Sequence, residues 1–252
     1  CILRIGAGAP RERFDAVQVE NLEYPDLTEY VKAHAYPVNQ TYLDNEGWSL
    51  ADEKTQALLL KIRAAGVPLG EYVAGRIYRG ILTGLNEAFV IDEATRERLI
   101  AADPKSAEVI KPFLAGRDVK RYTPPKSDRY LILFEKGISN KEGSDYRNKW
   151  EWVQNNYPAV AAYLQPFEVA AQKRCDKGDY WWELRACDYY DRFESPKLIF
   201  PDIAPRPNFT IDETGGFFDA NTCYNLFYSD KFLLGLLNSQ VINYYYRYLA
   251  AV

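Results

Sequence analysis

The sequence predicts an α+β fold of mixed, mostly antiparallel short strands with interleaved helices and a helical segment at the C-terminus. Short runs rich in β-branched and aromatic residues are separated by proline, glycine and acidic turns, and segments with helical spacing lie between them. The two kinds of segment alternate without a regular strand-helix-strand period. A length of 252 residues and a hydrophobic content of 47% are enough for a sizeable core.

A β-hairpin is expected over Cys1–Glu20, ahead of the main fold. Apolar residues at 2–5 precede a turn with glycine and proline, and alternation resumes from Phe14. The "GAG" at residues 6–8 could also be the cofactor loop of a Rossmann-like methyltransferase, in which glycines let the backbone approach the ligand. A strand follows it instead of the helix that such a loop requires, so a hairpin turn is favoured.

Helices and strands then interleave along the chain. A short helical stretch is expected over 25–40, and a firmer helix begins at Ser49, which has capping-box-like spacing to Asp52, and stops at Gly66. Further strands are predicted at 75–81, 88–91 and 130–134, and further helices at 93–101, 106–114, 145–155 and 158–171.

The last third of the chain is predicted to be rich in strands before it closes with helix. Four β-rich runs follow Asp179, namely "YWWELR", "PKLIFP", "PNFTID" and "TCYNLFY". Residues 230–250 carry an apolar stripe at helical spacing, which predicts one or two packed helices.

Charge is distributed unevenly. The net charge of −4 argues against a wholesale basic nucleic-acid binder. Residues 1–60 hold five Lys and Arg against ten Asp and Glu, whereas residues 111–149 hold ten against five. The basic stretch is suited to facing phosphates, and the alternative is an ordinary solvated loop region.

Several kinds of chemistry are disfavoured. The four cysteines form no CxxC pair and His34 is the single histidine, so neither a zinc site nor a hydrolase triad is expected. No catalytic residue and no metal ligand is predicted. No apolar run is long enough to span a bilayer and no leader is visible, so we expect a cytoplasmic protein without a membrane partner.

The stretch "RGILTGLNEAFVID", residues 79–92, raises the question of a phosphate-binding loop. A P-loop needs a lysine and a hydroxyl residue after its last glycine, followed by a helix, whereas Leu85 and Asn86 and a strand-like run follow here. Gly80 and Gly84 are better explained as turn residues that allow positive φ or close backbone approach. We interpret the stretch as a structural signature first, and only the family resemblance given below implies that it is also a DNA-contacting loop.

A set of basic, amide and aromatic residues in predicted loops forms the candidate DNA-binding site. Arginine recognises guanine edges, asparagine recognises adenine, and lysine or tyrosine positions phosphates. The candidates are Arg79, Thr83, Asn86, Arg117, Lys120, Arg121, Tyr122, Arg185, Arg206 and Asn208.

From about Trp48 onward, an ordered set of motifs resembles the TaqI-like C-terminal specificity domain, the target-recognition domain of adenine-specific DNA methyltransferases and type IIG restriction-modification enzymes. The motifs are "RGILTGLNEAFVID", "DPKSAEVIKPFLAGRDVKRY", "WWELR", "YYDRFESPKLIFPDIAPRPNFTID" and "LLGLLNSQVINYYYRYL". The resemblance implies a specificity domain over 48–252. It also implies that 1–47 is the terminal hairpin and connector of an upstream methyltransferase domain.

The resemblance implies that this chain recognises double-stranded DNA and directs methylation, with or without cleavage, to a target site. In the family, the upstream domain binds S-adenosylmethionine and methylates a flipped adenine. The segment "YTPPK" at 122–126 departs from the catalytic Asn-Pro-Pro-aromatic loop, so no cofactor and no catalysis are expected in this fragment. S-adenosylmethionine, and magnesium for any nuclease, would belong to the parent protein. The alternatives are a protein-interaction module and a self-sufficient S-adenosylmethionine-dependent enzyme.

Overall fold

The computed structural model describes residues 8–9, 11–19, 21–43 and 48–249, and it confirms the α+β class. The chain divides into two compact units, one of residues 1–68 with 243–252 and one of residues 69–242. The predicted boundary between residues 47 and 48 stays a prediction.

The smaller unit contains a short antiparallel pair, β1 (Arg13–Ala16) with β2 (Tyr36–Asn39), which flanks α1 (Leu27–His34). β1 falls in the second strand of the predicted hairpin, while the first strand, residues 2–5, lies outside the described residues. The helix expected from Ser49 begins later, as α2 (Glu53–Ala64). Asp52 caps it instead, because its carboxylate accepts the first free backbone N–H groups at 2.9 and 3.1 Å.

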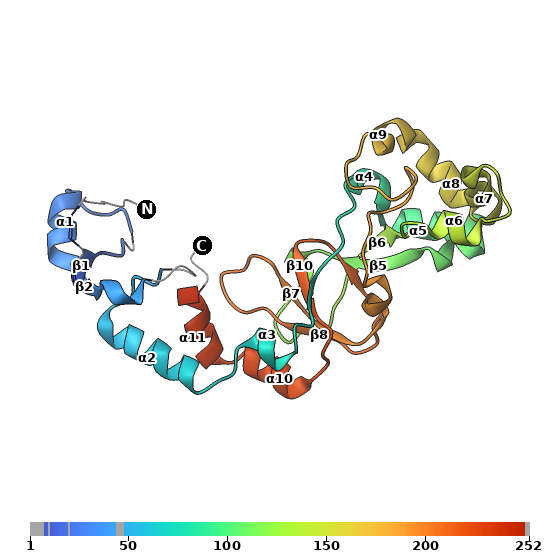
Figure 1. The fold of residues 1–252 in the computed structure, drawn as a ribbon. Helices are drawn as coiled ribbons and strands as arrows, with labels where there is room; N and C mark the ends of the chain where they lie inside the picture. The colour runs from blue at the N-terminus through green and yellow to red at the C-terminus, as the bar shows by residue number, and fades with distance from the viewer. Residues whose placement is uncertain (1–7, 10, 20, 44–47, 250–252) are drawn as a thin grey trace. The chain divides into compact units, whose positions relative to one another are not determined.

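The first of two four-stranded sheets in the larger unit is antiparallel throughout (Figure 1). Its order is β3 (Ile77–Arg79), β10 (Cys223–Leu226), β7 (Lys197–Pro201) and β8 (Thr210–Asp212). The helices α3 (Leu69–Tyr72) and α10 (Lys231–Leu237) flank this sheet in sequence, and leucines of α10 pack with Phe209 and Leu226 in one apolar cluster.

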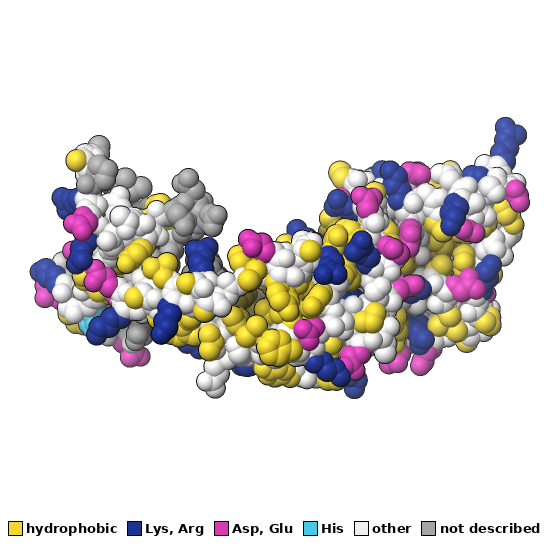
Figure 2. Space-filling view, turned by 60° about the horizontal axis from the view of Figure 1, so that its bottom comes forward, with side chains coloured by type: hydrophobic (Ala, Val, Ile, Leu, Met, Phe, Trp, Pro, Cys, Tyr) yellow, Lys and Arg dark blue, Asp and Glu magenta, His cyan; other side chains and the backbone are white. Residues whose placement is uncertain are grey.

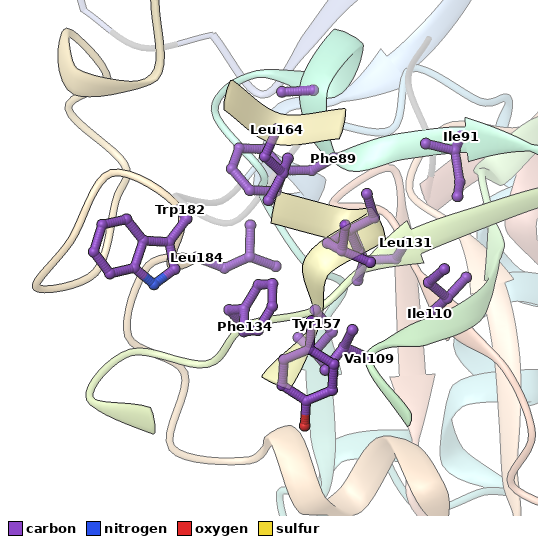
Figure 3. Packing of buried hydrophobic residues seen from close by; sticks show 14 of the residues in the cluster. Phe89, Ile91, Val109, Ile110, Leu131, Phe134, Tyr157, Leu164, Trp182 and Leu184 are labelled. Carbon is purple, nitrogen blue, oxygen red and sulfur yellow. The ribbon is translucent and has the colours of Figure 1, made fainter. Parts of the chain in front are cut away.

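The second sheet has the order β4 (Val90–Asp92), β6 (Arg129–Ile132), β5 (Ile110–Leu114) and β9 (Phe218–Asp219), and only its β5–β9 pair is parallel among the described strands. Apolar side chains from this sheet and its helices form the main core, which includes Phe89, Leu131 and Leu164 (Figure 3). Each such buried side chain contributes roughly 1.5–3 kcal/mol of hydrophobic free energy. The helices around the core are α4 (Asn86–Phe89), α5 (Glu93–Ala102), α6 (Ile138–Glu142), α7 (Lys149–Asn156), α8 (Pro158–Leu164) and α9 (Glu168–Gln172).

The helix predicted over 106–114 is wrong, because the chain forms β5 there after a 3₁₀ turn at Pro104–Glu108. Pro112 would break a helix interior at a cost of about 3 kcal/mol. In the central strand, Ile110, Phe113 and Leu114 are instead buried between β6 and β9. The single helix predicted over 158–171 is divided into α8, a 3₁₀ turn and α9.

The strand predicted at "YWWELR" is also wrong, because turn hydrogen bonds and a buried side chain satisfy much of this backbone in place of a strand ladder. The buried guanidinium of Arg174 donates to the carbonyls of Trp181 and Glu183 at 2.6 and 2.9 Å. The carboxylate of Glu183 in turn accepts the backbone N–H of Ser139 at 3.1 Å. The tryptophans are buried, as their apolar character predicts, but in a turn.

The two sheets meet at Gly80, directly after β3. Its N–H donates to the carbonyl of Cys223 in the first sheet at 2.9 Å, and the N–H of Ile81 donates to Asp219 in the second at 2.7 Å. A Cβ on Gly80 would lie 2.1 Å from the carbonyl oxygen of Ala220, so no other residue fits without a backbone shift. Gly84 has a φ of +69°. The structural interpretation of both glycines is confirmed, although the strand predicted at 88–91 is partly wrong, because α4 (Asn86–Phe89) precedes β4.

We therefore expect Gly80→Ala to destabilise the larger unit by about 3 kcal/mol, because the added methyl group clashes with backbone. Urea unfolding followed by tryptophan fluorescence measures the change. Gly70→Ala is the matched control, since a Cβ there meets nothing within 4 Å. Equal midpoints for the two variants would contradict the close approach at Gly80.

Candidate nucleic-acid interface

Loops from the first sheet gather at one of its edges. Because neighbouring strands are antiparallel, the carboxyl ends of β3 and β7 and the amino ends of β10 and β8 lie at the same edge. The second sheet adds the chain that follows β5. We call this surface the loop edge and define it as residues 79–82, 116–123, 202–209 and 220–222.

Hydrogen bonds fix the loops from the two sheets against each other. The N–H of Gly116, which follows β5, donates to the hydroxyl of Thr222 at 3.0 Å. The N–H of Asp202, which follows β7, donates to the carbonyl of the same Thr222 at 2.8 Å, and the N–H of Ala220 donates to Leu114 at 2.8 Å. Three loops from two sheets therefore share one anchored position.

Seven of the ten predicted DNA-binding residues lie at the loop edge, although they are spread over 130 positions of sequence. They are Arg79, Arg117, Lys120, Arg121, Tyr122, Arg206 and Asn208.

Arg79 is held in an orientation along the loop edge. Its Nε donates to the carbonyl of Asn221 at 2.8 Å, and its guanidinium forms an ion pair with Asp202 at 3.3 Å. The side chains are 52% and 34% exposed, so this ion pair contributes little stability and costs little to open. The guanidinium is thus oriented without being sequestered.

Arg117, Lys120 and Arg206 are exposed, and within the described part of the chain none of them is in an ion pair. The ammonium of Lys120 donates to the backbone carbonyl of Arg117 at 2.7 Å, so it lies beside the segment that carries Arg117. The face seen in Figure 2 carries Lys and Arg side chains interspersed with Asp, Glu and apolar ones.

The basic stretch of residues 111–149 does not form one surface. β6 runs away from the loop edge, so the cations that follow it, such as Lys136 and Lys141, lie toward the opposite edge of the second sheet. Lys136 pairs with Asp179 at 3.6 Å. At the start of the stretch, Lys111 pairs with Glu194 at 2.8 Å.

Arg121 and Tyr122 are partly structural. The guanidinium of Arg121 donates to the carbonyl of Asn238 and lies 4.9 Å from the ring centroid of Tyr122. Tyr122 is 54% exposed and has a φ of +59°, which is rare for a bulky residue and is often found at functional sites. The tyrosine ring is thus presented at the surface from a constrained backbone.

The remaining three candidates lie elsewhere, around Arg174. Thr83 is 2% exposed and donates to Asn86 Oδ1 at 2.5 Å, so its hydroxyl is engaged within the fold. A contact between Thr83 and DNA stays a prediction, and the burial of the threonine side chain argues against it. Asn86 is exposed but is the acceptor of that bond, and Arg185 pairs with Asp176 at 3.4 Å.

One feature of the loop edge was missed in the sequence. Ile203 is 77% exposed between the acidic Asp202 and the segment "APRPN". In that segment Pro205 and Pro207 flank Arg206, and proline fixes its own φ and restricts the preceding residue. The paired prolines were the available signal for a stiff loop that presents a single arginine.

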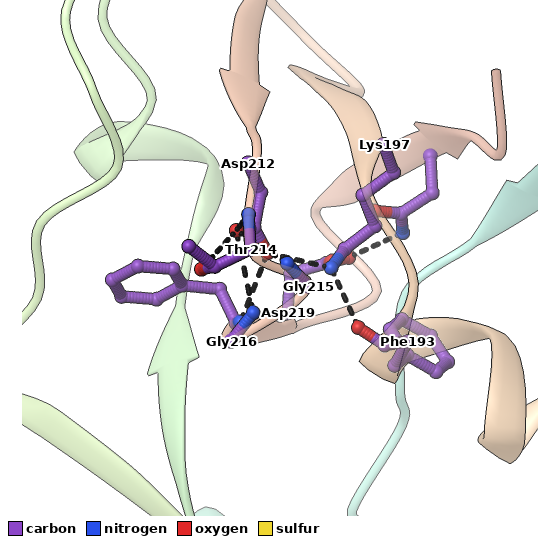
Figure 4. Close-up of polar contacts among 9 residues, drawn as sticks. Phe193, Lys197, Asp212, Thr214, Gly215, Gly216 and Asp219 are labelled. Carbon is purple, nitrogen blue, oxygen red and sulfur yellow. Dashed lines mark hydrogen bonds and ion pairs between the residues drawn. The ribbon is translucent and has the colours of Figure 1, made fainter. Parts of the chain in front are cut away.

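A buried ion pair lies at the end of the first sheet that is opposite the loop edge. Lys197 and Asp212 form an ion pair at 2.8 Å with 0% and 2% exposure, and the same carboxylate accepts backbone N–H groups of the following turn, including Gly215 at 3.0 Å (Figure 4). Although burial opposes it, the hydrogen bond and charge of Lys197 lower the pKa of Asp212.

Asp219 is a buried carboxyl of the opposite kind. It is fully buried on β9 and accepts one hydrogen bond from Asn225 Nδ2 at 2.9 Å. Burial raises its pKa to about 7, against the hydrogen bond from Asn225 and the charge of Lys197. Within the described part of the chain, Asp219 Oδ2 and Asn225 Oδ1 have no hydrogen-bond partner. The raised pKa and the unpaired oxygen atoms both fit an Asp219 carboxyl that is protonated below about pH 7.

A depression of about 580 Å³ lies at the other end of the second sheet. Its lining includes Glu108, Glu135, Glu142, Asp191 and Glu194, against Lys105 and Lys111. Burial, together with the charges of Glu194 and Asp191, raises the pKa of Glu135. This excess of carboxylates opposes phosphate binding there, in contrast to the loop edge.

The described residues contain no group of three or more His, Cys, Asp and Glu side chains that could hold a metal ion. His34 bonds to the carbonyl of Tyr30 at 2.9 Å and stacks on its ring. Burial raises the pKa of the Cys187 thiol, which disfavours a nucleophilic thiolate. Over the residues that the structure describes, no helix has the length and apolar character needed to cross a membrane.

Residues 111–251 match the family model of the TaqI-like C-terminal specificity domain. The chain is similar to the Type II methyltransferase M.BanIII of Aneurinibacillus aneurinilyticus, with 21% identity over 179 residues, which are 66% of this chain and 29% of that protein. The matched part of this chain thus spans well under half of the length of this relative. Among solved structures, the Type IIL restriction-modification enzyme MmeI in complex with DNA aligns with a TM-score of 0.40 and 14% identity, over 65% of this chain and 20% of that chain.

The titration of Asp219 gives a pH-dependent prediction. An unfolded aspartate has a pKa of about 3.9, so a folded pKa of about 7 means that the folded state binds more protons between these values. The contribution of Asp219 to the free energy of unfolding is therefore fully present below about pH 4 and is lost as the pH rises to about 7. Asp219→Asn, which supplies a permanent N–H donor, should remove this loss.

We expect the stability of Asp219→Asn relative to wild type to rise between pH 5 and pH 8, as measured by urea unfolding at each pH. Asp92→Asn is the control, because hydrogen bonds from Thr95 lower the pKa of Asp92 and keep it ionised throughout this range. If the free energies of unfolding of Asp219→Asn and wild type differ by the same amount at pH 5 and at pH 8, Asp219 does not titrate between these pH values in the folded state.

Proposed function

Because the chain belongs to the TaqI-like C-terminal specificity domain family, whose model matches residues 111–251, we propose that it recognises a target sequence in double-stranded DNA for a restriction-modification enzyme. The match confirms the resemblance seen in the sequence motifs. It describes a restriction-modification specificity domain related to methyltransferases. The recognition of DNA by this chain, and the residues that perform it, are the proposal.

The observation that carries the proposal is the loop edge. Seven candidate residues from three separate segments converge there on hydrogen-bonded loops at the junction of two sheets. Binding residues are commonly placed on loops that a rigid scaffold positions. The acidic depression at the other end of the second sheet is unsuited to DNA, which leaves the loop edge as the favoured surface.

The chemistry of the loop edge suggests two roles. Arg117 and Lys120 are adjacent exposed cations, suited to phosphates, and such contacts fix register without sequence information. Arg206 and Asn208 lie on the stiff loop after β7, and a guanidinium and an amide can each form two hydrogen bonds to a base edge in the major groove. Arg79 and Tyr122 would support either role.

The rest of the activity would reside outside the specificity domain. We propose that residues 1–47 complete an upstream methyltransferase domain, which binds S-adenosylmethionine and methylates adenine in cytoplasmic DNA, and that 48–252 form the specificity domain. A fused endonuclease, with its own magnesium, is compatible with this arrangement. In this arrangement, the specificity domain in this chain selects the target sequence.

A salt titration of the full-length protein on its cognate duplex tests the proposal. Neutralised phosphates release counterions, so the logarithm of the association constant should fall linearly with the logarithm of salt concentration. Binding that is insensitive to salt, or equal affinity for cognate and unrelated duplexes, would show that this chain does not recognise a DNA sequence.

Lys120→Ala should weaken binding to all duplexes by a similar factor and reduce the salt slope by about 1, because one phosphate contact is lost. Lys141→Ala removes a cation that is 79% exposed on α6, where it pairs with Glu142 at 3.2 Å, and should leave affinity and slope unchanged. The two variants can be compared by fluorescence anisotropy at several salt concentrations. Equal salt slopes for the two variants would show that Lys120 makes no phosphate contact.

A further inference from the structure

Asn238 directly follows α10, and its side chain is fully buried beneath the loop edge. Its Oδ1 accepts the backbone N–H of Phe209 at 3.0 Å, and its Nδ2 donates to the carbonyl of the same residue at 2.8 Å. One amide side chain thus engages both backbone groups of one residue, as a paired strand would. These two hydrogen bonds fix the backbone of Phe209, the residue directly before β8.

The same contact holds a second loop. The carbonyl of Phe209 also accepts the N–H of Tyr122 at 3.3 Å, and the backbone carbonyl of Asn238 accepts the guanidinium of Arg121. The ring of Phe209 stacks on Phe200 of β7 at 4.7 Å between centroids. Asn238 therefore joins the end of α10 to two of the segments that form the loop edge.

The segment before Phe209 is short and stiff. It is anchored at its start by the N–H of Asp202, which donates to Thr222 at 2.8 Å, and at its end by Asn238. Between the anchors, Pro205 and Pro207 restrict the backbone on both sides of Arg206. Little freedom is left for the loop to adjust, so the position of its arginine follows the position of its anchors.

We infer that Asn238 is a positioning residue for target discrimination, which holds the loop 202–209 so that Arg206 meets the edge of one base pair. The inference rests on the proposed function and deepens it. Bidentate recognition tolerates only small displacements of the guanidinium. Asn238 does not touch DNA itself, because it is buried.

The test measures discrimination, meaning the ratio of affinities of the full-length protein for its cognate duplex and for duplexes changed at one base pair. Arg206→Ala should lose about tenfold discrimination at one base pair. Asn238→Asp replaces the Nδ2 donor by an oxygen that repels the Phe209 carbonyl, so it should lose discrimination at that same base pair. The salt slope should stay unchanged, because the phosphate contacts remain.

A double-mutant cycle separates positioning from general weakening. If Asn238 acts through Arg206, Asn238→Asp should cause no further loss of discrimination in the Arg206→Ala background. The inference would be overturned if the two substitutions reduce discrimination independently, so that their factors multiply in the double variant. It would also be overturned if the Asn238→Asp protein discriminates like wild type. Should Asn238→Asp fail to fold in thermal unfolding, Asn238→Ser, which keeps one short polar group without charge, takes its place in the same cycle.

Asn148→Ala is the matched control, since it removes another asparagine side chain, the cap of α7, which accepts Trp150 N–H at 3.1 Å. It should lower stability and leave discrimination unchanged. Lost discrimination in this control would assign the effect to stability and overturn the inference. A wild-type protein without preference among duplexes would instead refute the proposed function.

Discussion

The close passage of the backbone at Gly80 beside Ala220 is the constraint on which both sheets of the larger unit depend. One short segment donates a hydrogen bond to Cys223 in the first sheet and, one residue later, to Asp219 in the second. The space for this crossing exists only because residue 80 has no Cβ. Loops that belong to different sheets therefore emerge at one edge, where the basic segment after β5 meets the loop after β7.

Buried polar side chains hold the irregular segments that the sheets leave without partners. Arg174 satisfies carbonyls of the tryptophan-rich turn, and the carboxylate of Glu183 accepts the backbone N–H of Ser139. Asp212, paired with Lys197, fixes the turn after β8, and Asn238 fixes the loop before β8. Removing one partner of the buried ion pair would cost about 3–5 kcal/mol, because the other charge is left unpaired. The loops are thus as well defined as regular elements, which suits a surface that must present side chains to a rigid duplex.

Local pattern predicted the elements whose burial follows a simple period. The strand at Tyr130 was recognisable because it is a short apolar run. The one or two helices predicted over 230–250 correspond to α10 and α11 (Gln240–Leu249), whose apolar residues recur at helical spacing. The segment around Pro112 was misassigned since its apolar residues fit either a helix or a strand buried on both faces. The candidate site shows the same limit: residue types were informative, yet Thr83 is buried and the guanidinium of Arg121 is bound by a backbone carbonyl.

The sequence by itself determined the α+β class, the order of most elements, the interpretation of Gly80 as a structural glycine and the family resemblance, because these depend on composition, short-range spacing and ordered motifs. The tertiary structure alone decided that Arg79, Arg117 and Arg206 share one edge, and that Asn238 lies beneath it. These residues are separated by tens of positions. Strand pairing and the close passage of the backbone at Gly80 bring these residues together. Neither can be predicted from the local periodicity of the sequence.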